Sequence, residues 1–276
     1  MSILMLPKAH PEVVLIDWHA TLVDTHDAMY HAVDEVLPKL VELDLFDRLL
    51  HPEDSKTIED AKLLTYVRDN NRLHPKVVQQ RKISRTDIFE VLFGDDEGAK
   101  RLAHKAFDES YRNYVGEVQP LESDTFEQLS AVRDLGIQLG VITNRNHEFM
   151  LHELDKVEEG RWHVLFDTIV SGNHVERRKP APDLLLEALR RLGHPADETV
   201  WYVGDSTTDV IAAKEAGVEA IFYNGAQWNQ DWIDKIFPGT PKHPHRPDAV
   251  IASMADLHQL ARWVLAQELR VERARS

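Results

Sequence analysis

The stretch that most constrains the fold is residues 13–17, Val-Val-Leu-Ile-Asp, in which four apolar residues lead straight into a carboxylate. An unbroken run of β-branched and other apolar residues predicts a strand that is buried on both faces, as in a parallel sheet. Asp17 then falls at the carboxyl end of that strand, where open α/β sheets place their ligand sites. A core strand whose aspartate only caps the next helix would show the same pattern.

Two later stretches end in residues suited to binding a phosphoryl group. Residues 139–143 are a second apolar run, which ends in Thr143 and is followed by Asn144. Hydroxyl and backbone donors suit phosphoryl oxygens, although a threonine at the end of a strand is also ordinary. Lys179 comes just before an expected helix with proline near its start, and the alternative for it is a solvated surface lysine.

A third apolar run, residues 200–204, ends in glycine and is followed by Asp205 and, four residues on, by Asp209. Carboxylates placed after a buried strand can hold Mg2+, which prefers oxygen ligands. The same residues could instead cap a helix and interact favourably with its dipole. The Gly-Asp pair directly after a buried run favours the metal site.

Taken in this order, the four stretches resemble the four motifs of the haloacid dehalogenase superfamily, in its phosphatase and phosphonatase-like branch. The resemblance covers residues 11–23 and 119–222. It implies an enzyme that hydrolyses a small phosphate monoester with the help of Mg2+. The partner implied is therefore a small phosphorylated metabolite.

The resemblance also implies a role for each motif residue. Asp17 would be the nucleophile and would form an aspartyl phosphate, which splits one displacement into two easier ones. Thr143 and the backbone amide of Asn144 would bind the phosphoryl oxygens. Lys179 would neutralise charge on the nucleophile and on the phosphoryl group.

The Mg2+ ligands implied by the resemblance are Asp17, Asp205, Asp209 and the backbone carbonyl of His19. Asp209 lies one helical turn beyond Asp205, so it would serve as a ligand or would support the ligands from behind.

His19 stands where the family's usual motif has a second aspartate, which protonates the leaving oxygen and then activates water. An imidazole can do this work near neutral pH. The substitution is equally compatible with altered or lost activity. One alternative is therefore a C–P bond hydrolase resembling phosphonoacetaldehyde hydrolase. That family also has tryptophan after the nucleophile, and it needs a cap lysine, for which Lys56 and Lys62 are available. The other alternative is a protein that binds a phosphate ligand without turning it over.

The remaining pattern predicts an α/β fold with a doubly wound parallel sheet. Strands and helices alternate after residue 119, which implies right-handed crossovers. The expected strands are residues 13–17, 139–143, 166–170, 200–204, 219–222 and 248–251. Residues 224–247 are rich in proline and tryptophan and are expected to be irregular.

Between residues 24 and 118 apolar residues recur at helical spacing, and those from Met29 to Leu43 fit one face of a single helix. The block is too long for one crossover. We therefore expect an inserted helical cap domain at 24–118 and a core domain made of residues 1–23 and 119–276.

Composition narrows the remaining classes. The formal net charge of −15 argues against a nucleic-acid or anionic-membrane partner. The chain has no cysteine, which excludes disulfides, thiolate catalysis and cysteine-ligated metals. The chain lacks an apolar stretch long enough to span a membrane and a signal peptide at its start, so the expected location is the cytoplasm. These features leave the oligomeric state open.

Overall fold

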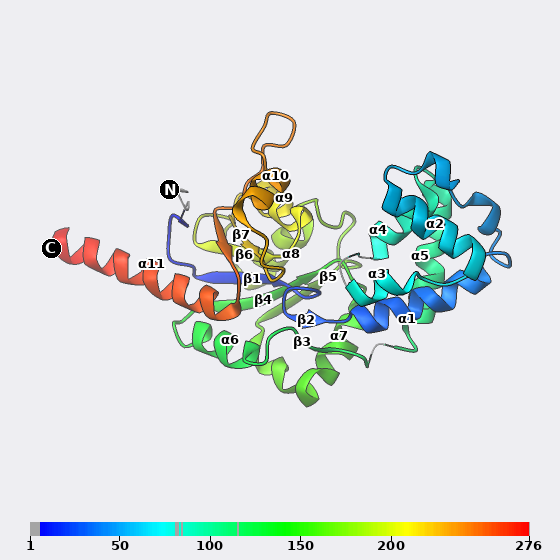
Figure 1. The fold of residues 1–276 in the computed structure, drawn as a ribbon. Helices are drawn as coiled ribbons and strands as arrows, with labels where there is room; N and C mark the ends of the chain where they lie inside the picture. Colours follow the sequence, from blue (N-terminus) through cyan, green and yellow to red (C-terminus); the bar gives the residue numbers. More distant parts are fainter. Residues whose placement is uncertain (1–5, 81–82, 84, 115, 276) are drawn as a thin grey trace. The chain divides into compact units, whose positions relative to one another are not determined.

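The computed structural model describes residues 6–80, 83, 85–114 and 116–275, and its chain forms two compact units (Figure 1). The core unit consists of Met1–Asp24 and Gln119–Ser276, and the inserted unit is Thr25–Val118. Within the described residues, none of the helices is both long and apolar enough to cross a membrane.

The core unit is built on a six-stranded sheet in which every pairing is parallel. In their order across the sheet, the strands are β5 (Thr168–Ser171), β4 (Gln138–Thr143), β1 (Val13–Asp17), β6 (Val200–Gly204), β7 (Glu219–Tyr223) and β8 (Ala249–Ile251). Each strand lies within two residues of its expected bounds. The prediction of a doubly wound parallel α/β sheet is confirmed.

Helices cover both faces of this sheet (Figure 1). They are α6 (Thr125–Arg133), α7 (His147–Lys156), α8 (Asp183–Leu192), α9 (Thr207–Ala216), α10 (Gln230–Ile236) and α11 (Met254–Arg275). The apolar faces of α8 and α9 pack with inward side chains of the sheet, such as Leu15, Ile142 and Phe222, into one core cluster. Figure 1 shows α8, α9 and α10 on one face and α6 and α7 on the other.

The strand order determines where a ligand can bind. The chain passes from β1 outward through β4 to β5, and then returns to the other side of β1 through β6, β7 and β8. Connections therefore leave the neighbouring strands β1 and β6 in opposite directions, and open α/β sheets place their ligand sites at the carboxyl ends of strands at such a switch point. Asp17 ends β1, and Asp205 directly follows β6.

The inserted unit is helical, with α1 (His26–Val36), α2 (Ile58–Asn70), α3 (Pro75–Gln80), α4 (Arg85–Phe93) and α5 (Glu97–Tyr111). The expectation of one helix from Met29 to Leu43 is wrong. The α-helix ends at Val36 and continues as a short 3-10 turn over Leu37–Lys39. Pro38 explains this change, because it lacks the backbone N–H and its ring would clash with the preceding turn.

Two features escaped the sequence patterns. The short strands β2 (Val23–Asp24) and β3 (Gln119–Pro120) pair antiparallel at the point where the chain leaves and re-enters the core unit. Helix α10 lies within residues 224–247, which were expected to be irregular, and the Asn229 side chain caps it by accepting a hydrogen bond from the Trp232 N–H at 3.0 Å.

Candidate active site

Three carboxylates meet at the carboxyl ends of β1 and β6. Asp17 comes from the last position of β1, Asp205 from the residue after β6, and Asp209 from the first turn of α9. Each offers an oxygen that lies within 4.8 Å of those of the other two. The structure therefore brings these three sequence-predicted residues into one cluster at the switch point of the sheet.

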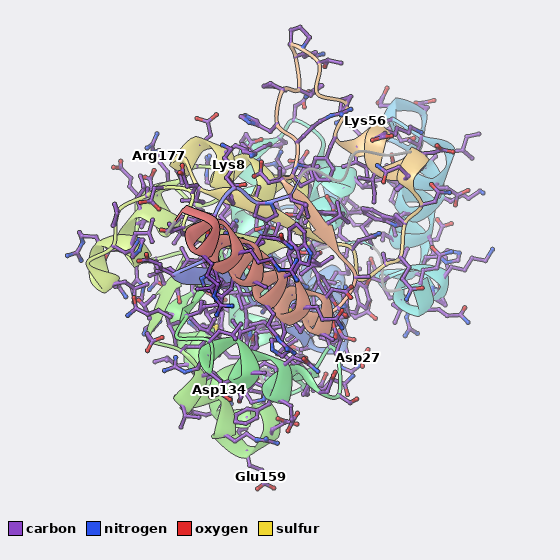
Figure 2. All side chains as sticks on the ribbon, turned by 90° about the vertical axis from the view of Figure 1, so that its left-hand side faces the viewer. Lys8, Asp27, Lys56, Asp134, Glu159 and Arg177 are labelled. Carbon is purple, nitrogen blue, oxygen red and sulfur yellow. The ribbon has the colours of Figure 1, made fainter. Side chains whose placement is uncertain are left out.

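Lys179 lies in the same cluster and is the only one of three consecutive basic residues to do so. Its Nζ donates to Asp17 Oδ1 at 2.8 Å, to Asp209 Oδ1 at 2.7 Å and to the Tyr202 hydroxyl at 2.8 Å. All three ammonium protons thus have an acceptor. By contrast, Arg177 lies at the outer surface of the core unit, where it pairs with Asp183 (Figure 2).

Burial and mutual charge set the protonation of this cluster. Burial raises the pKa of Asp17 to about 6, with Lys179 opposing the rise and Asp209 adding to it. Burial and the charges of Asp209 and Asp17 raise the pKa of Asp205 well above its ordinary value. For Asp209, burial opposes ionisation, but the charge of Lys179 and the hydrogen bonds from Lys179, Ser206 and Tyr202 together outweigh it and lower the pKa. The two partner carboxylates likewise outweigh burial at Lys179 and raise its pKa.

Asp209 is held by the protein through both oxygens. Oδ1 accepts from Lys179 and from Tyr202, and Oδ2 accepts from the backbone N–H and the hydroxyl of Ser206, at 3.1 and 2.5 Å. Ser206 in turn caps α9, which completes a capping box. Gly204 is required here, because a Cβ at that position would collide with the Asp209 side chain.

Thr143 is the last residue of β4, the strand beside β1, and Asn144 directly follows it. Thr143 is buried, and its Oγ1 accepts from the Arg145 N–H at 3.1 Å. The Asn144 side chain donates to the Lys179 carbonyl at 3.1 Å and accepts from the Lys179 N–H at 2.9 Å. Asn144 therefore fixes the backbone of Lys179 with its side chain, a role that the sequence did not indicate.

His19 lies in the tight turn that follows β1. The turn is closed by hydrogen bonds from the Leu22 and Val23 N–H groups to the Trp18 carbonyl, both 3.0 Å long. Ala20 adopts the left-handed conformation, with φ of 59°. The His19 Nδ1 lies 3.4 Å from Nη2 of Arg145.

A second polar network beside the site was missed from the sequence. Glu153 on α7 is fully buried, accepts from the Trp18 indole N–H at 2.7 Å and forms an ion pair with Arg145 at 3.2 Å. The network thus joins the residue after Asp17 to a residue two positions after Thr143. The burial of Glu153 is the feature that would have revealed this network. Burial cannot be predicted from the residue type alone, because glutamate is usually exposed.

Comparison with known proteins agrees with this geometry. Residues 14–223 match the model of the haloacid dehalogenase-like hydrolase family. The chain belongs to this family. The prediction made from the four motifs is thereby confirmed, as is the prediction that the chain is an enzyme, a hydrolase.

This haloacid dehalogenase-like hydrolase is 28% identical to phosphoglycolate phosphatase of Escherichia coli over 182 residues, which are 65% of this chain and 67% of that protein. Its fold resembles a haloacid dehalogenase-like hydrolase from Bacteroides fragilis, with a TM-score of 0.62, 20% identity and coverage of 90% of this chain and 99% of that chain. It also resembles CbbY from Rhodobacter sphaeroides in complex with xylulose-(1,5)bisphosphate, with a TM-score of 0.54, 19% identity and coverage of 90% and 96%.

The carboxylate cluster suits a divalent cation. Three carboxylates face one ammonium, so two formal negative charges remain uncompensated when all are ionised. The ligand type is the one that hard cations such as Mg2+ prefer. Asp17 and Asp205 fit the role of direct ligands best, because both oxygens of Asp209 already accept hydrogen bonds from the protein.

The lysines considered for C–P bond cleavage lie in a different setting. Lys62 is 62% exposed and pairs with Glu59 at 2.7 Å, and Lys56 is exposed at the start of the same region. A lysine that forms an imine must lose its proton, which is favoured by a desolvated site or a neighbouring cation. Neither lysine has a desolvated setting.

Proposed function

We propose that this enzyme hydrolyses a small phosphate monoester through a covalent aspartyl phosphate on Asp17. The observation that carries the proposal is the Lys179 ammonium, which binds Asp17 and Asp209 at once and lies beside Asp205 at the sheet's switch point. The similarity of the chain to phosphoglycolate phosphatases supports hydrolysis of a phosphate ester, and a 2-phosphoglycolate-like ester is the first substrate to test.

In the first step, a carboxylate oxygen of Asp17 attacks phosphorus and the bond from phosphorus to the leaving oxygen breaks. Lys179 keeps the nucleophile in place through Oδ1 and offsets negative charge there. Thr143 and the amide of Asn144 bind the phosphoryl oxygens. In the second step, water attacks phosphorus, inorganic phosphate departs and the Asp17 carboxylate is restored.

Mg2+ bound by Asp17, Asp205 and the carbonyl of His19 would supply a Lewis acid that draws the phosphoryl oxygens toward the nucleophile. Asp209 supports this set indirectly, through Lys179 and Ser206. The ligand assignment rests on the clustering of the carboxylates and on the hydrogen bonds that occupy Asp209.

We assign His19 to the leaving oxygen. Arginine has only donors, so the contact between Arg145 and Nδ1 is a hydrogen bond when Nδ1 is the acceptor. The ring proton then lies on Nε2, which can donate a hydrogen bond to the oxygen on which charge develops. In this arrangement the proton that completes the alcohol comes from water.

We also propose that residues 24–118 are the cap domain and that 1–23 and 119–276 are the catalytic core.

The test is phosphate release from a panel of phosphate monoesters, measured with and without Mg2+. Asp17→Asn should lower turnover by at least about 1000-fold while the circular dichroism spectrum stays unchanged, because the covalent nucleophile is lost. The matched control is Asp183→Asn, which makes the same chemical change at the Arg177 ion pair and should keep wild-type turnover. Turnover of Asp17→Asn within tenfold of wild type would contradict the proposal.

A further inference from the structure

The turn that follows β5 is closed by a histidine side chain. The Ser171 N–H donates to His174 Nδ1 at 3.1 Å, and the His174 N–H donates back to the Ser171 carbonyl at 2.8 Å. A ring nitrogen accepts a hydrogen bond only while it carries no proton, so the ring proton of His174 lies on Nε2. Acid adds a second proton at Nδ1 and turns the acceptor into a donor that faces the Ser171 N–H.

A second histidine, His147 at the start of α7, packs against the first. The two ring centroids lie 4.4 Å apart, and His147 Nδ1 lies 3.1 Å from the hydroxyl oxygen of Ser171, which is fully buried. The His147 N–H also donates to the Asn173 side chain at 2.8 Å. The turn is therefore tied to the first residue of α7 through both side chains and backbone.

The surroundings of the two rings favour their neutral forms. Burial lowers the pKa of both histidines, and the ring of His147 and then Arg191 on α8 add to this effect at His174. Arg191 also adds to it at His147. Glu187 on α8 acts in the opposite direction at His174, but it pairs with Arg191 at 2.8 Å. Arg178 brings a further positive charge to the turn, where it donates to a backbone carbonyl at 3.2 Å.

The turn also contacts the backbone that follows β4. The Gly172 N–H donates to the Arg145 carbonyl at 2.7 Å, and a Cβ on Gly172 would lie 2.4 Å from the Asn144 carbonyl oxygen. Backbone therefore packs on backbone, and a shift of the turn would displace Asn144. The side chain of Asn144 in turn holds the backbone of Lys179.

We propose that His174 is a positioning residue for the phosphoryl site, whose neutral ring keeps the turn at 171–174 closed against Asn144. Acid that protonates His174 opens the turn and removes this support from the Asn144 amide and from Lys179. His147 helps by contacting both Ser171 and the His174 ring. The effect on turnover rests on the proposed function, whereas the opening of the turn does not.

Two substitutions of similar shape separate the acceptor from the rest of the ring. His174→Asn keeps an uncharged acceptor near the position of Nδ1 at every pH, because its amide oxygen can replace that nitrogen. His174→Gln places its amide near the position of Nε2 and leaves the Ser171 N–H without its acceptor. The matched control is His163→Asn, which changes an exposed histidine of the core unit that pairs with Asp155 at 2.6 Å.

The assay measures kcat/KM on p-nitrophenyl phosphate at saturating Mg2+ between about pH 5 and about pH 8, which brackets the ordinary histidine pKa. At each pH the wild type is compared with each variant, so that the titration of Asp17, which all of them share, cancels. Relative to His174→Asn, the wild type should lose about fivefold toward the acid end, the factor that one ordinary hydrogen bond contributes. His174→Gln should be slower than wild type already at about pH 8, where the wild-type ring is neutral. His163→Asn should follow wild type at every pH.

Two kinetic outcomes would overturn the inference. A ratio of wild type to His174→Asn that stays constant over this pH range would show that the proton on His174 does not affect the phosphoryl site. Wild-type kcat/KM in His174→Gln at about pH 8 would show that the bond from Ser171 to the ring does not position the site.

Hydrogen exchange separates the inference from the proposed function, because it needs no substrate. At about pH 8, the backbone amides of residues 144–146 and 171–174 should exchange faster in His174→Gln than in wild type and His163→Asn. Faster exchange there supports the opening of the turn even if no phosphate ester is hydrolysed. Unchanged exchange refutes it, whatever the turnover assay shows.

Discussion

The hydroxyl of Tyr202 offers the sharpest test of how this site is built. It accepts from Lys179 Nζ and donates to Asp209 Oδ1, each at 2.8 Å, and the side chain is buried. Tyr202→Phe removes one oxygen and leaves the ring in place. One ammonium proton of Lys179 then loses its acceptor, and Asp209 loses a donor.

The expected cost follows from those two contacts. A hydrogen bond to a charged group contributes about 1.5–3 kcal/mol, and a buried donor left unsatisfied keeps its desolvation penalty. We therefore expect Tyr202→Phe to lower the free energy of unfolding of the core unit by about 2–4 kcal/mol. We also expect kcat to fall by roughly 10- to 100-fold, because Lys179 is no longer held in one position.

Urea unfolding followed by circular dichroism measures the first effect, and steady-state phosphate release measures the second. The matched control is Tyr223→Phe on the neighbouring strand β7, whose hydroxyl donates to Glu122 at 2.7 Å. It should lose stability but keep turnover. If Tyr202→Phe changes the unfolding free energy by less than about 0.5 kcal/mol and leaves kcat at the wild-type value, the two carboxylates alone hold Lys179.

Three further predictions concern the metal and the leaving group. Asp205→Ala should abolish calorimetric Mg2+ binding together with turnover, since it removes a direct ligand; unchanged metal affinity would refute that role. His19→Ala should lose on the order of 100-fold in kcat on an alkyl phosphate and much less on p-nitrophenyl phosphate, whose leaving group needs no hydrogen bond. Equal rates of variant and wild type on both esters would remove His19 from the mechanism. Mg2+ affinity should weaken as the pH falls through about 6, because the metal must displace the protons that the raised pKa values of Asp17, about 6, and of Asp205 retain. A pH-independent affinity between pH 5 and pH 8, roughly the range that brackets the pKa of Asp17, would contradict binding of the metal through these two carboxylates.

The sheet and the ends of its strands could be predicted because the signal is local. The runs that form β1 and β6 are apolar up to Asp17 and Gly204, where the residue type changes and the strands end. In a parallel sheet this change marks the carboxyl end. The positions of Asp17 and Asp205 relative to the strands therefore followed from the order of residues alone.

The hydrogen bonds that Tyr202 and Glu153 make around the site could not be predicted, because the sequence pattern around each residue indicates a different role. Tyr202 belongs to an apolar run and reads as a core residue, and its hydroxyl becomes polar support only when Lys179 reaches it from 23 positions away. Glu153 reads as part of a helix surface, and its partner Trp18 is 135 positions away. Residue type and spacing carry no information on such contacts.

The register of Lys179 lies between these two cases. Three basic residues follow one another, and the sequence favoured Lys179 only through its resemblance to a motif. The structure shows a physical reason, because the side chain of Asn144 accepts a hydrogen bond from the Lys179 N–H and donates one to the Lys179 carbonyl. Arg178 instead contacts the Gly172 carbonyl at 3.2 Å.

The pairing of β2 with β3 has a consequence for how the sequence of such an enzyme can change in evolution. Val23 pairs with Pro120 and Asp24 pairs with Gln119, so the chain leaves and re-enters the core unit at adjacent, hydrogen-bonded positions. The segment inserted between β2 and β3 begins and ends at neighbouring points, so its length does not alter the strand order of the sheet. Insertions, deletions or replacement of the inserted unit therefore leave the positions of Asp17 and Asp205 in the sheet unchanged.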